Sequence, residues 1–323
     1  MIRITHKRAR QIVAHFKEKR MLVLGDVMLD RYIWGEVSRI SPEAPIPVVR
    51  VRRESSCLGG AGNVGQNLLR LGAHPVLTGV VGRDPEGRWI REHVEDGRGL
   101  FSTPTRPTTV KTRIIAHSQQ VVRVDREETR PISPGLEGKI FRFIREERPE
   151  GLLISDYNKG LVTPSLVEKV LLFAKRQGIP VFVDPKVDHF THFSPVTLLT
   201  PNHHEAERIV HHECLSDEDV ERAGRTILSE ISAEFLILKR GPHGLSVFEK
   251  GRRALHIPAV AKEVYDVTGA GDTVIAVAAL ALLAGASIRE AAVLANVAAG
   301  LVVAKVGTAA ITPEELLAGL PAR

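Results

Sequence analysis

The sequence predicts an α/β protein with a mostly parallel central sheet, helices on both faces of that sheet, and a small β-strand lid. Short apolar segments of strand type alternate with longer segments of helical periodicity along most of the 323 residues. Two stretches, residues 32–57 and 107–126, break this alternation with β-branched, Arg-rich patterns and no intervening helix. We therefore expect a single domain, residues 1–323, whose lid these two stretches form as antiparallel strands.

The individual helices and strands follow from the same patterns, in chain order. An apolar run at residues 21–25 predicts the first strand, and residues 26–30 are expected to form a loop after it. Further apolar runs predict strands at residues 75–81, 152–155, 180–183, 197–199, 235–239 and 245–248. Helical spacing, with Gly178 as a stop signal, predicts helices at residues 63–71, 164–177, 272–284 and 288–303.

Composition limits the class of protein. The chain has 44 basic and 38 acidic residues, interspersed, which favours a solvated surface over nucleic-acid binding and suits a small anionic substrate. Two cysteines are too few for a disulfide framework. The N-terminus lacks the apolar core of a signal peptide, and no apolar run reaches the ~20 residues that cross a bilayer. We expect a cytoplasmic protein that binds neither nucleic acid nor membranes.

The segment 266–272 (DVTGAGD) is the first candidate for catalysis. Its glycines allow the backbone to approach a ligand closely, and an Ala/Leu-rich helix follows at once. Free amides and the dipole at a helix N-terminus bind anions, so Asp272 could accept a proton from a hydroxyl while the amides hold a phosphoryl group. The structural alternative is that the glycines shape a tight turn and Asp272 only caps the helix.

The segment 59–65 (GGAGNVG) offers a competing interpretation. Gly60, Gly62 and Gly65 match the dinucleotide-binding fingerprint, and Asp84 lies roughly where its ribose-binding acid is expected. The residues before it, 52–56, are polar, whereas the fingerprint needs a buried strand there. A glycine-rich turn that carries Asn63 toward a polar ligand is therefore favoured over a nicotinamide oxidoreductase.

Polar residues follow several predicted strands. Ligands of open parallel sheets bind beyond the carboxyl ends of the strands, so these side chains are expected to outline a cleft. They are Asp26, Asp30, Asp156, Lys159, Asp184, Lys186, Asn202 and Glu205. No Gly-Lys-Ser/Thr sequence is present, which excludes a Walker A loop. The histidine pairs 203–204 and 211–212 are expected at the surface or as caps, since adjacent helical residues point in different directions.

These motifs resemble those of the ribokinase-like (PfkB) carbohydrate kinases. Residues 59–63 resemble the N-terminal signature of that family, and residues 266–272 match the C-terminal one closely. The similarity runs from residue 23 to residue 308. It implies a ribokinase-like three-layer sandwich, ATP and Mg²⁺ as cofactors, and lids that pair between two subunits, so that a homodimer is expected.

The resemblance also implies a role for each matching position. Asp272 corresponds to the general base, and Gly269, Ala270 and Gly271 supply amides to the phosphoryl group. Asn202 and Glu205 match an Asn-x-x-Glu element near magnesium and the ATP phosphates, with Glu205 beside the metal. The nucleotide would lie against Lys239, Gly241, Gly244 and Asn296, and the sugar hydroxyls against Asp30, Gly60 and Asn63. Candidates for a substrate phosphate are Lys111, Arg113, Arg123, Lys159 and Lys186, because arginine grips phosphate bidentately and lysine as a point charge.

One branch of the family is more similar than the rest. Residues 38–49 (SRISPEAPIPVV) closely resemble the lid of kinases that phosphorylate the C1 hydroxyl of D-glycero-D-manno-heptose 7-phosphate for lipopolysaccharide core synthesis. Residues 25–32, 119–125, 155–160 and 183–186 are similar too. Bifunctional members carry a nucleotidyltransferase domain after the kinase, whereas this sequence ends at Arg323. We expect a stand-alone kinase, or one domain of a longer protein, with a nucleotidyltransferase acting downstream.

The residues at variable positions of two motifs, 202–205 (NHHE) and 238–241 (LKRG), differ from the commonest versions in the family. This difference concerns nucleotide contacts and not the type of reaction. A kinase for another sugar, such as fructose, ribose or their phosphates, remains the nearest alternative. A nicotinamide oxidoreductase and a non-catalytic sugar-phosphate sensor are the alternatives of a different class.

Overall fold

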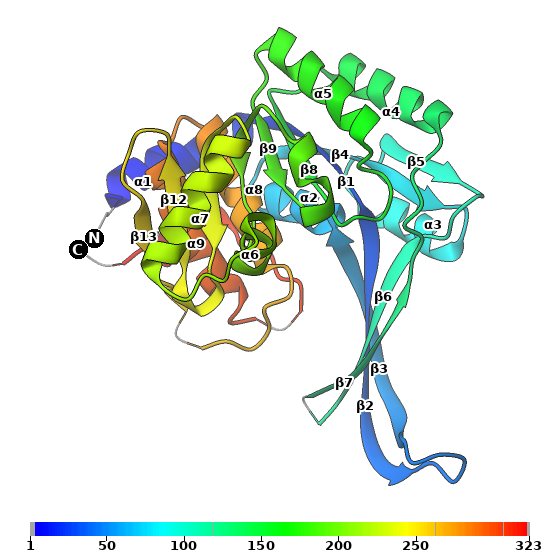
Figure 1. Ribbon diagram of the computed structural model, residues 1–323. Helices are drawn as coiled ribbons and strands as arrows, with labels where there is room; N and C mark the ends of the chain where they lie inside the picture. The colour runs from blue at the N-terminus through cyan, green and yellow to red at the C-terminus, as the bar shows by residue number, and fades with distance from the viewer. Residues whose placement is uncertain (1–3, 118, 262, 306, 322–323) are drawn as a thin grey trace.

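The computed structural model describes residues 4–117, 119–261, 263–305 and 307–321 and contains two sheets (Figure 1). The strands of the larger sheet are β1 (Arg20–Gly25), β4 (His74–Gly82), β5 (Gly99–Thr103), β8 (Gly151–Ser155), β9 (Val181–Asp184), β10 (Val196–Leu199), β11 (Ala233–Lys239), β12 (Leu245–Glu249) and β13 (Leu255–Ile257). The strands of the smaller sheet are β2 (Val27–Ile40), β3 (Pro47–Gly60), β6 (Thr109–Ala116) and β7 (Gln119–Arg126).

The larger sheet is mostly parallel. Its order is β13-β12-β11-β10-β9-β8-β1-β4-β5, and every pairing between β11 and β5 is parallel. The pairings of β12 with β11 and with β13 are antiparallel. The smaller sheet, in the order β3-β2-β6-β7, projects from this body as the lid (Figure 1). The predicted class is confirmed.

Helices cover both faces of the larger sheet. They are α1 (His6–Ala14), α2 (Ala61–Arg70), α3 (Pro85–His93), α4 (Pro134–Glu147), α5 (Pro164–Gln177), α6 (His203–Val210), α7 (Asp217–Glu230), α8 (Ala270–Leu283), α9 (Ile288–Val302) and α10 (Pro313–Ala318). Capping boxes fix the first turns of α6, α7, α9 and α10, and Gly178 ends α5 in the left-handed conformation as predicted. None of the helices described is long and apolar enough to span a bilayer.

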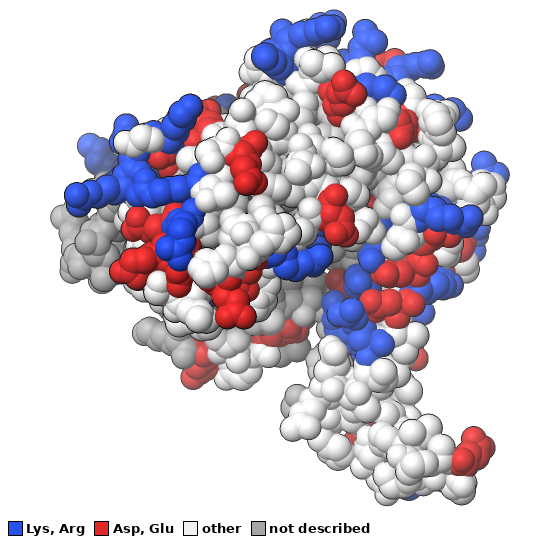
Figure 2. All heavy atoms as spheres, viewed as in Figure 1, with Lys and Arg blue, Asp and Glu red and all other residues white. Residues whose placement is uncertain are grey.

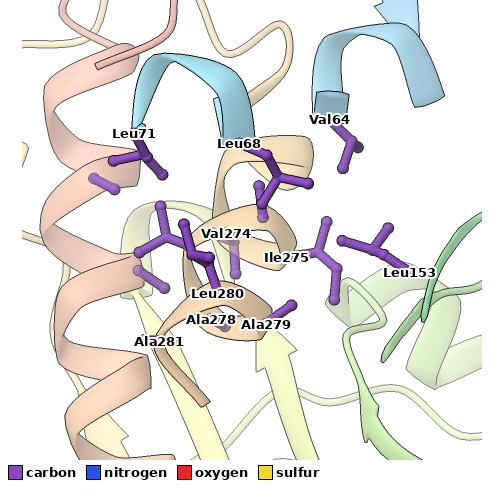
Figure 3. Close-up of a cluster of buried hydrophobic side chains, with 14 of the residues drawn as sticks. Val64, Leu68, Leu71, Leu153, Val274, Ile275, Ala278, Ala279, Leu280 and Ala281 are labelled. Carbon is purple, nitrogen blue, oxygen red and sulfur yellow. The ribbon is translucent and has the colours of Figure 1, made fainter. Parts of the chain in front are cut away.

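The core consists of two layers, one on each side of the larger sheet. Along β1, Met21 and Val23 join one apolar cluster while Leu22 and Leu24 join the other, as the two-residue period of a strand requires. The first cluster contains side chains of α2, α8 and α9, and the second contains side chains of α4, α5 and α7. Figure 3 shows Val64 and Leu68 of α2 facing side chains of α8. This contact seats the N-terminus of α8, which carries Asp272, against α2.

Two expectations about the strands are wrong. Residues 26–30 are not a loop: β2 starts at Val27, with only Asp26 between it and the end of β1, and continues into the lid. The apolar residues of this segment are flanked by Asp26 and Asp30, which hid the strand in the sequence pattern. The lid is also not wholly antiparallel, because β2 and β6 pair in parallel. Each of these two strands leaves the body in the same direction, and each forms its own antiparallel hairpin, with β3 and β7. Residue 118 of the predicted lid and residue 306 of the similar region lie outside the described residues.

Candidate active site

The carboxyl ends of the parallel strands gather the polar residues that the sequence singled out. The Asp26 carboxylate, after β1, accepts the backbone amides of Tyr157 and Lys159, both at 3.0 Å, and that of Leu161 at 3.3 Å. The Asp156 carboxylate, after β8, accepts the amide of Lys186 at 3.1 Å. The predicted convergence is confirmed, and these two buried acids serve to fix the loops around them.

Asp272 lies in the first turn of α8 and is only 3% exposed. Each of its carboxylate oxygens receives one hydrogen bond: Asn63 Nδ2 donates to Oδ2 at 2.7 Å, and the Tyr157 hydroxyl donates to Oδ1 at 2.7 Å. The N-cap of α8 is Gly269, and no side chain caps the helix. The amide of Ala270 donates to the backbone oxygen of Val267 at 3.2 Å, whereas those of Gly271 and Asp272 are available to an anion beside the carboxylate. The alternative that Asp272 is merely the helix cap is wrong.

Burial raises the pKa of Asp272 to about 7, and the charge of Asp184 adds to the rise. The hydrogen bonds from Asn63 and Tyr157 and the charge of Lys239 act in the opposite direction. A carboxylate with a pKa near the working pH is well matched to take up a proton and release it again. The electrostatics of this site thus suit a general base.

Asp272 is connected through Asn63 to a buried network between α2 and α8. Asn67 donates to the backbone oxygen of Asn63 at 2.9 Å, and the Thr273 hydroxyl donates to Asn67 Oδ1 at 3.0 Å. Gly269 has a φ of +79°, and a Cβ there would lie 2.6 Å from Asn63 Nδ2. The glycine is therefore required both by its backbone conformation and by the space that Asn63 occupies.

A second polar cluster lies at the ends of β9 and β11. Lys239 Nζ contacts Asp184 Oδ1 at 2.5 Å, and Lys186 Nζ contacts Glu205 Oε1 at 2.6 Å. Asn202 caps α6, and Glu205 Oε2 accepts the amide of Asn202 at 2.9 Å. Burial alone would lower the pKa of the Lys186 ammonium, but the charges of Glu205 and Asp184 outweigh it and raise that pKa. The sequence motifs around 184–186, 202–205 and 239 thus meet in space.

The other residues predicted to bind the nucleotide are Gly241, Gly244 and Asn296. Gly241 adopts a φ of +56° with open space around its Cα, whereas Gly244, with a φ of +84°, packs against the backbone after β13. Asn296 of α9 is buried, and its side-chain amide donates to the backbone oxygen of Pro258 at 2.8 Å. Gly244 and Asn296 therefore hold the β12–β13 edge in place, and Gly241 is open to a ligand.

One face of the lid gathers most of the residues predicted to bind the sugar phosphate. The strand register pairs Asp30 with Lys111, and Arg113 with Arg123, so these side chains share a face. Arg113 Nη1 contacts Asp30 Oδ1 at 2.5 Å. Glu127 bridges Lys111 and Lys159, at 3.7 Å and 2.8 Å. Figure 2 shows charged side chains crowded at the root of the lid and few along its projecting end.

Gly60 occupies the turn between this face and α2. Its φ is +56°, and it directly precedes the helix that carries Asn63. The strand before it, β3, is an antiparallel lid strand and not the buried parallel strand of a dinucleotide-binding unit. The structure therefore does not support the nicotinamide alternative.

A large cavity lies away from these residues. It measures about 720 Å³ and opens at the opposite edge of the sheet, where Val181, Val196 and Ala233 begin their strands. None of the predicted site residues lines it. Around Asp272 the polar side chains of Asn63 and Tyr157 contact the carboxylate, and this chemistry marks the site.

Comparison with known proteins agrees with this geometry. A model of the pfkB family, described as carbohydrate kinases, matches residues 18–315. The chain belongs to the pfkB family of carbohydrate kinases.

Similar proteins place the chain within this family. It is 44% identical over 321 residues to the bifunctional protein HldE of Geobacter metallireducens, covering 97% of this chain and 65% of that protein. It is 46% identical over 304 residues to the bifunctional protein HldE of Nitratiruptor sp., covering 92% of this chain and 64% of that protein. The chain thus spans a little under two thirds of the length of these relatives.

Solved structures show the same fold at low identity. Arabidopsis thaliana ribokinase, complexed with ribose and ATP, aligns with a TM-score of 0.75 at 20% identity, over 94% of this chain and 99% of that one. Phosphofructokinase-2 of Escherichia coli aligns with a TM-score of 0.76 at 19% identity, over 94% and 99%. The ribokinase-like fold expected from the motifs is confirmed.

Sequence reasoning missed two groups in this pfkB-family site. Tyr157 lies within the similar segment 155–160, but no role was assigned to it, although a tyrosine directly after a strand-end aspartate was a signal. The Tyr32 hydroxyl is buried with no hydrogen-bond partner among the described residues, and its ring lies 5.3 Å from the guanidinium carbon of Arg113. A buried, unpartnered hydroxyl on the inner face of the lid is suited to a polar ligand.

Proposed function

We propose that this kinase transfers the γ-phosphoryl group of ATP to the C1 hydroxyl of D-glycero-D-manno-heptose 7-phosphate, giving the 1,7-bisphosphate and ADP. One observation carries the chemistry: a buried carboxylate, Asp272, with a pKa of about 7 at the uncapped N-terminus of α8. ATP is the expected donor in this carbohydrate kinase family, and the structurally similar ribokinase is complexed with ATP.

In the proposed reaction the residues at the N-terminus of α8 accept the proton and stabilise the transferring group. Asp272 accepts the proton of the C1 hydroxyl as the C1 oxygen forms its bond to the γ-phosphorus, and the bond from that phosphorus to the bridging oxygen of ADP breaks. The amides of Gly269 and Gly271 and the dipole of α8 stabilise the charge on the transferring group. The amide of Ala270, predicted to do the same, donates to the backbone oxygen of Val267 and would have to leave it to join them. Phosphoryl transfer depends mainly on such positioning and charge stabilisation.

The second polar cluster, at the ends of β9 and β11, fits a magnesium ion held through water. Each oxygen of Glu205 already accepts one hydrogen bond, from Lys186 and from the amide of Asn202, so a metal ion bound directly to Glu205 would lie beside the Lys186 ammonium. Mg²⁺ keeps several of its water ligands in proteins, and Glu205 and Asp184 are placed to accept from such waters. When bound with ATP, the metal would neutralise charge on the phosphates. Lys186 and Lys239 would do the same from the protein side, with Gly241 beside the nucleotide.

The sugar assignment rests on the lid. Residues 38–49 resemble the lid of heptose 7-phosphate kinases, and the bifunctional HldE proteins are similar over nearly the whole chain. The lid face carries Lys111, Arg113 and Arg123, with Lys159 beside it, which provides the cations that a 7-phosphate needs. We place Asp30, Gly60 and Asn63 against the sugar hydroxyls.

A homodimer through the lid is part of the proposal. The opposite face of the lid carries an apolar patch: the register brings Ile33, Ile114 and Val122 together, and Val124 on the same face is 54% exposed. Exposed β-branched residues on a projecting sheet would be covered by a second copy of the lid. Light scattering on the wild type and on Val122→Lys/Val124→Lys tests this: a monomeric wild type would contradict it.

We also propose a cytoplasmic location and a role in supplying ADP-heptose for the lipopolysaccharide core, with a nucleotidyltransferase acting on the product. The similar relatives are named bifunctional, which is consistent with two successive activities. Mass-spectrometric detection of the 1,7-bisphosphate as the product would support this order, and phosphorylation at any other hydroxyl would contradict it.

An ADP-release assay tests the function. Mg-ATP is supplied with D-glycero-D-manno-heptose 7-phosphate, sedoheptulose 7-phosphate, fructose 6-phosphate, fructose and ribose in parallel. Turnover confined to the manno-heptose phosphate is the expected result. Turnover on another sugar keeps the kinase and overturns the heptose assignment. Binding without any turnover would favour a sensor.

A further inference from the structure

Tyr157 is held against Asp272 by an unusually well-fixed loop. The loop follows β8, and the buried Asp26 carboxylate accepts the amides of Tyr157, Lys159 and Leu161. Asn158 and Gly160 turn the backbone with φ values of +55° and +82°. With its backbone anchored in this way, the tyrosine ring has little freedom to leave Asp272.

The tyrosine hydroxyl makes one defined contact. It donates to Asp272 Oδ1 at 2.7 Å, while Asn63 holds the other oxygen at the same distance. Burial, and then the charge of Asp272, raises the pKa of Tyr157 well above its usual value, so the hydroxyl stays protonated and remains a donor. Lys186 Nζ, which belongs to the second polar cluster, lies 5.5 Å from the centre of the ring. Tyr157 thus stands between the base and the groups assigned to the nucleotide.

We propose that Tyr157 is a positioning residue for the base: with Asn63 it fixes the Asp272 carboxylate in one orientation and favours its ionised form. This inference rests on the proposed role of Asp272. An ionised carboxylate has about four acceptor positions, so the acceptor hydroxyl of the sugar can bind while both of these hydrogen bonds persist. The carboxylate is then presented without a change of rotamer.

The charges around Asp272 determine how much this hydrogen bond matters. Asp184 of β9 disfavours the ionised form, whereas Lys239 of β11 favours it. The charge of Asp30 of β2 contributes to raising the pKa of the Tyr157 hydroxyl. Because one cation faces one nearby anion and the site is buried, the two neutral donors decide the balance.

Tyr157→Phe removes the hydroxyl and keeps the ring. Loss of a hydrogen bond to a charged group should move the acid limb of the kcat/KM profile upward by about one pH unit. At pH 7 the smaller ionised fraction then lowers kcat/KM by about fivefold, and this part of the loss disappears above about pH 9. Tyr265→Phe is the matched control, because the Tyr265 hydroxyl contacts Glu263 at an exposed position and should leave the profile unchanged.

A loss by the same factor at every pH, or an unshifted acid limb, would overturn the proposal, since a purely structural role predicts that result. A second readout needs no substrate: the difference in thermal stability between Tyr157→Phe and the wild type, followed against pH, reports the change in the pKa of Asp272. In the wild type, the stability contributed by protonated Asp272 is lost as the pH rises to about 7. In Tyr157→Phe this loss should continue to about pH 8. If heptose 7-phosphate is inert but this stability shift is found, the function is wrong and the role of Tyr157 stands. If the shift is absent, the role of Tyr157 is wrong whatever the substrate.

Discussion

Replacing Asp272 with asparagine should abolish catalysis and stabilise the protein at the same time. The folded state raises the pKa of this carboxyl from 3.8 to about 7 because it is buried. A group with a raised pKa contributes fully to stability below its unfolded pKa, and that contribution is lost as the pH rises through the folded pKa. Ionised Asp272 is therefore a cost to the folded state above about pH 7.

The size of the effect follows from the shift. Each pKa unit corresponds to about 1.4 kcal/mol, so a shift from 3.8 to about 7 amounts to roughly 4 kcal/mol at pH 8. Asparagine carries no charge, and its amide can still accept from Asn63 and donate to the Tyr157 hydroxyl, which both donates and accepts. Asp272→Asn should thus match the wild type at pH 4 and gain up to roughly 4 kcal/mol at pH 8.

Thermal unfolding of both proteins from pH 4 to pH 9 measures this difference, because subtraction removes the other titrating groups. In parallel, kcat should fall by about three orders of magnitude while Mg-ATP affinity stays near the wild-type value. Equal or lower stability of Asp272→Asn at pH 8 would refute the argument from burial. Retention of most of the turnover would refute the assignment of the base.

Two further substitutions test the surroundings of the base. Gly269→Ala should lower the free energy of unfolding by about 1–3 kcal/mol and reduce kcat, since it forces a Cβ into a φ of +79° and toward Asn63. Gly271→Ala is its control, where a Cβ meets only the flexible end of Lys239, and equal losses of stability in the two variants would contradict the explanation. Arg113→Lys should raise KM for the sugar phosphate about tenfold and leave KM for ATP unchanged, because lysine keeps the charge beside Asp30 but loses the planar fork. A change confined to KM for ATP would contradict the assignment of Arg113 to the sugar phosphate.

The sequence alone determined the fold class and singled out Asp272 as the candidate base. Alternation of strand and helix patterns predicted the parallel sheet, since each pattern is local and repeats along the chain. The segment 266–272 singled out Asp272 because glycines and an acid at the start of an Ala-rich helix form a compact local motif. In the structure its last three residues, 270–272, form the first turn of α8. Gly178 likewise ended α5 where predicted, because the left-handed conformation is a property of the glycine itself.

Only the tertiary structure decided which polar residues act on one another. Asp26 and Asp30 are four residues apart, yet one anchors the loop of Tyr157 and the other pairs with Arg113 in the lid. Asn63 and Tyr157 reach Asp272 across 209 and 115 residues. The sequence also did not predict that β2 and β6 pair in parallel. Strand partners and their relative direction depend on the path of the chain between the two strands, which local patterns do not encode. A local pattern fixes the chemistry that each residue can offer, whereas the pKa of Asp272 arises from burial and charges that folding brings together.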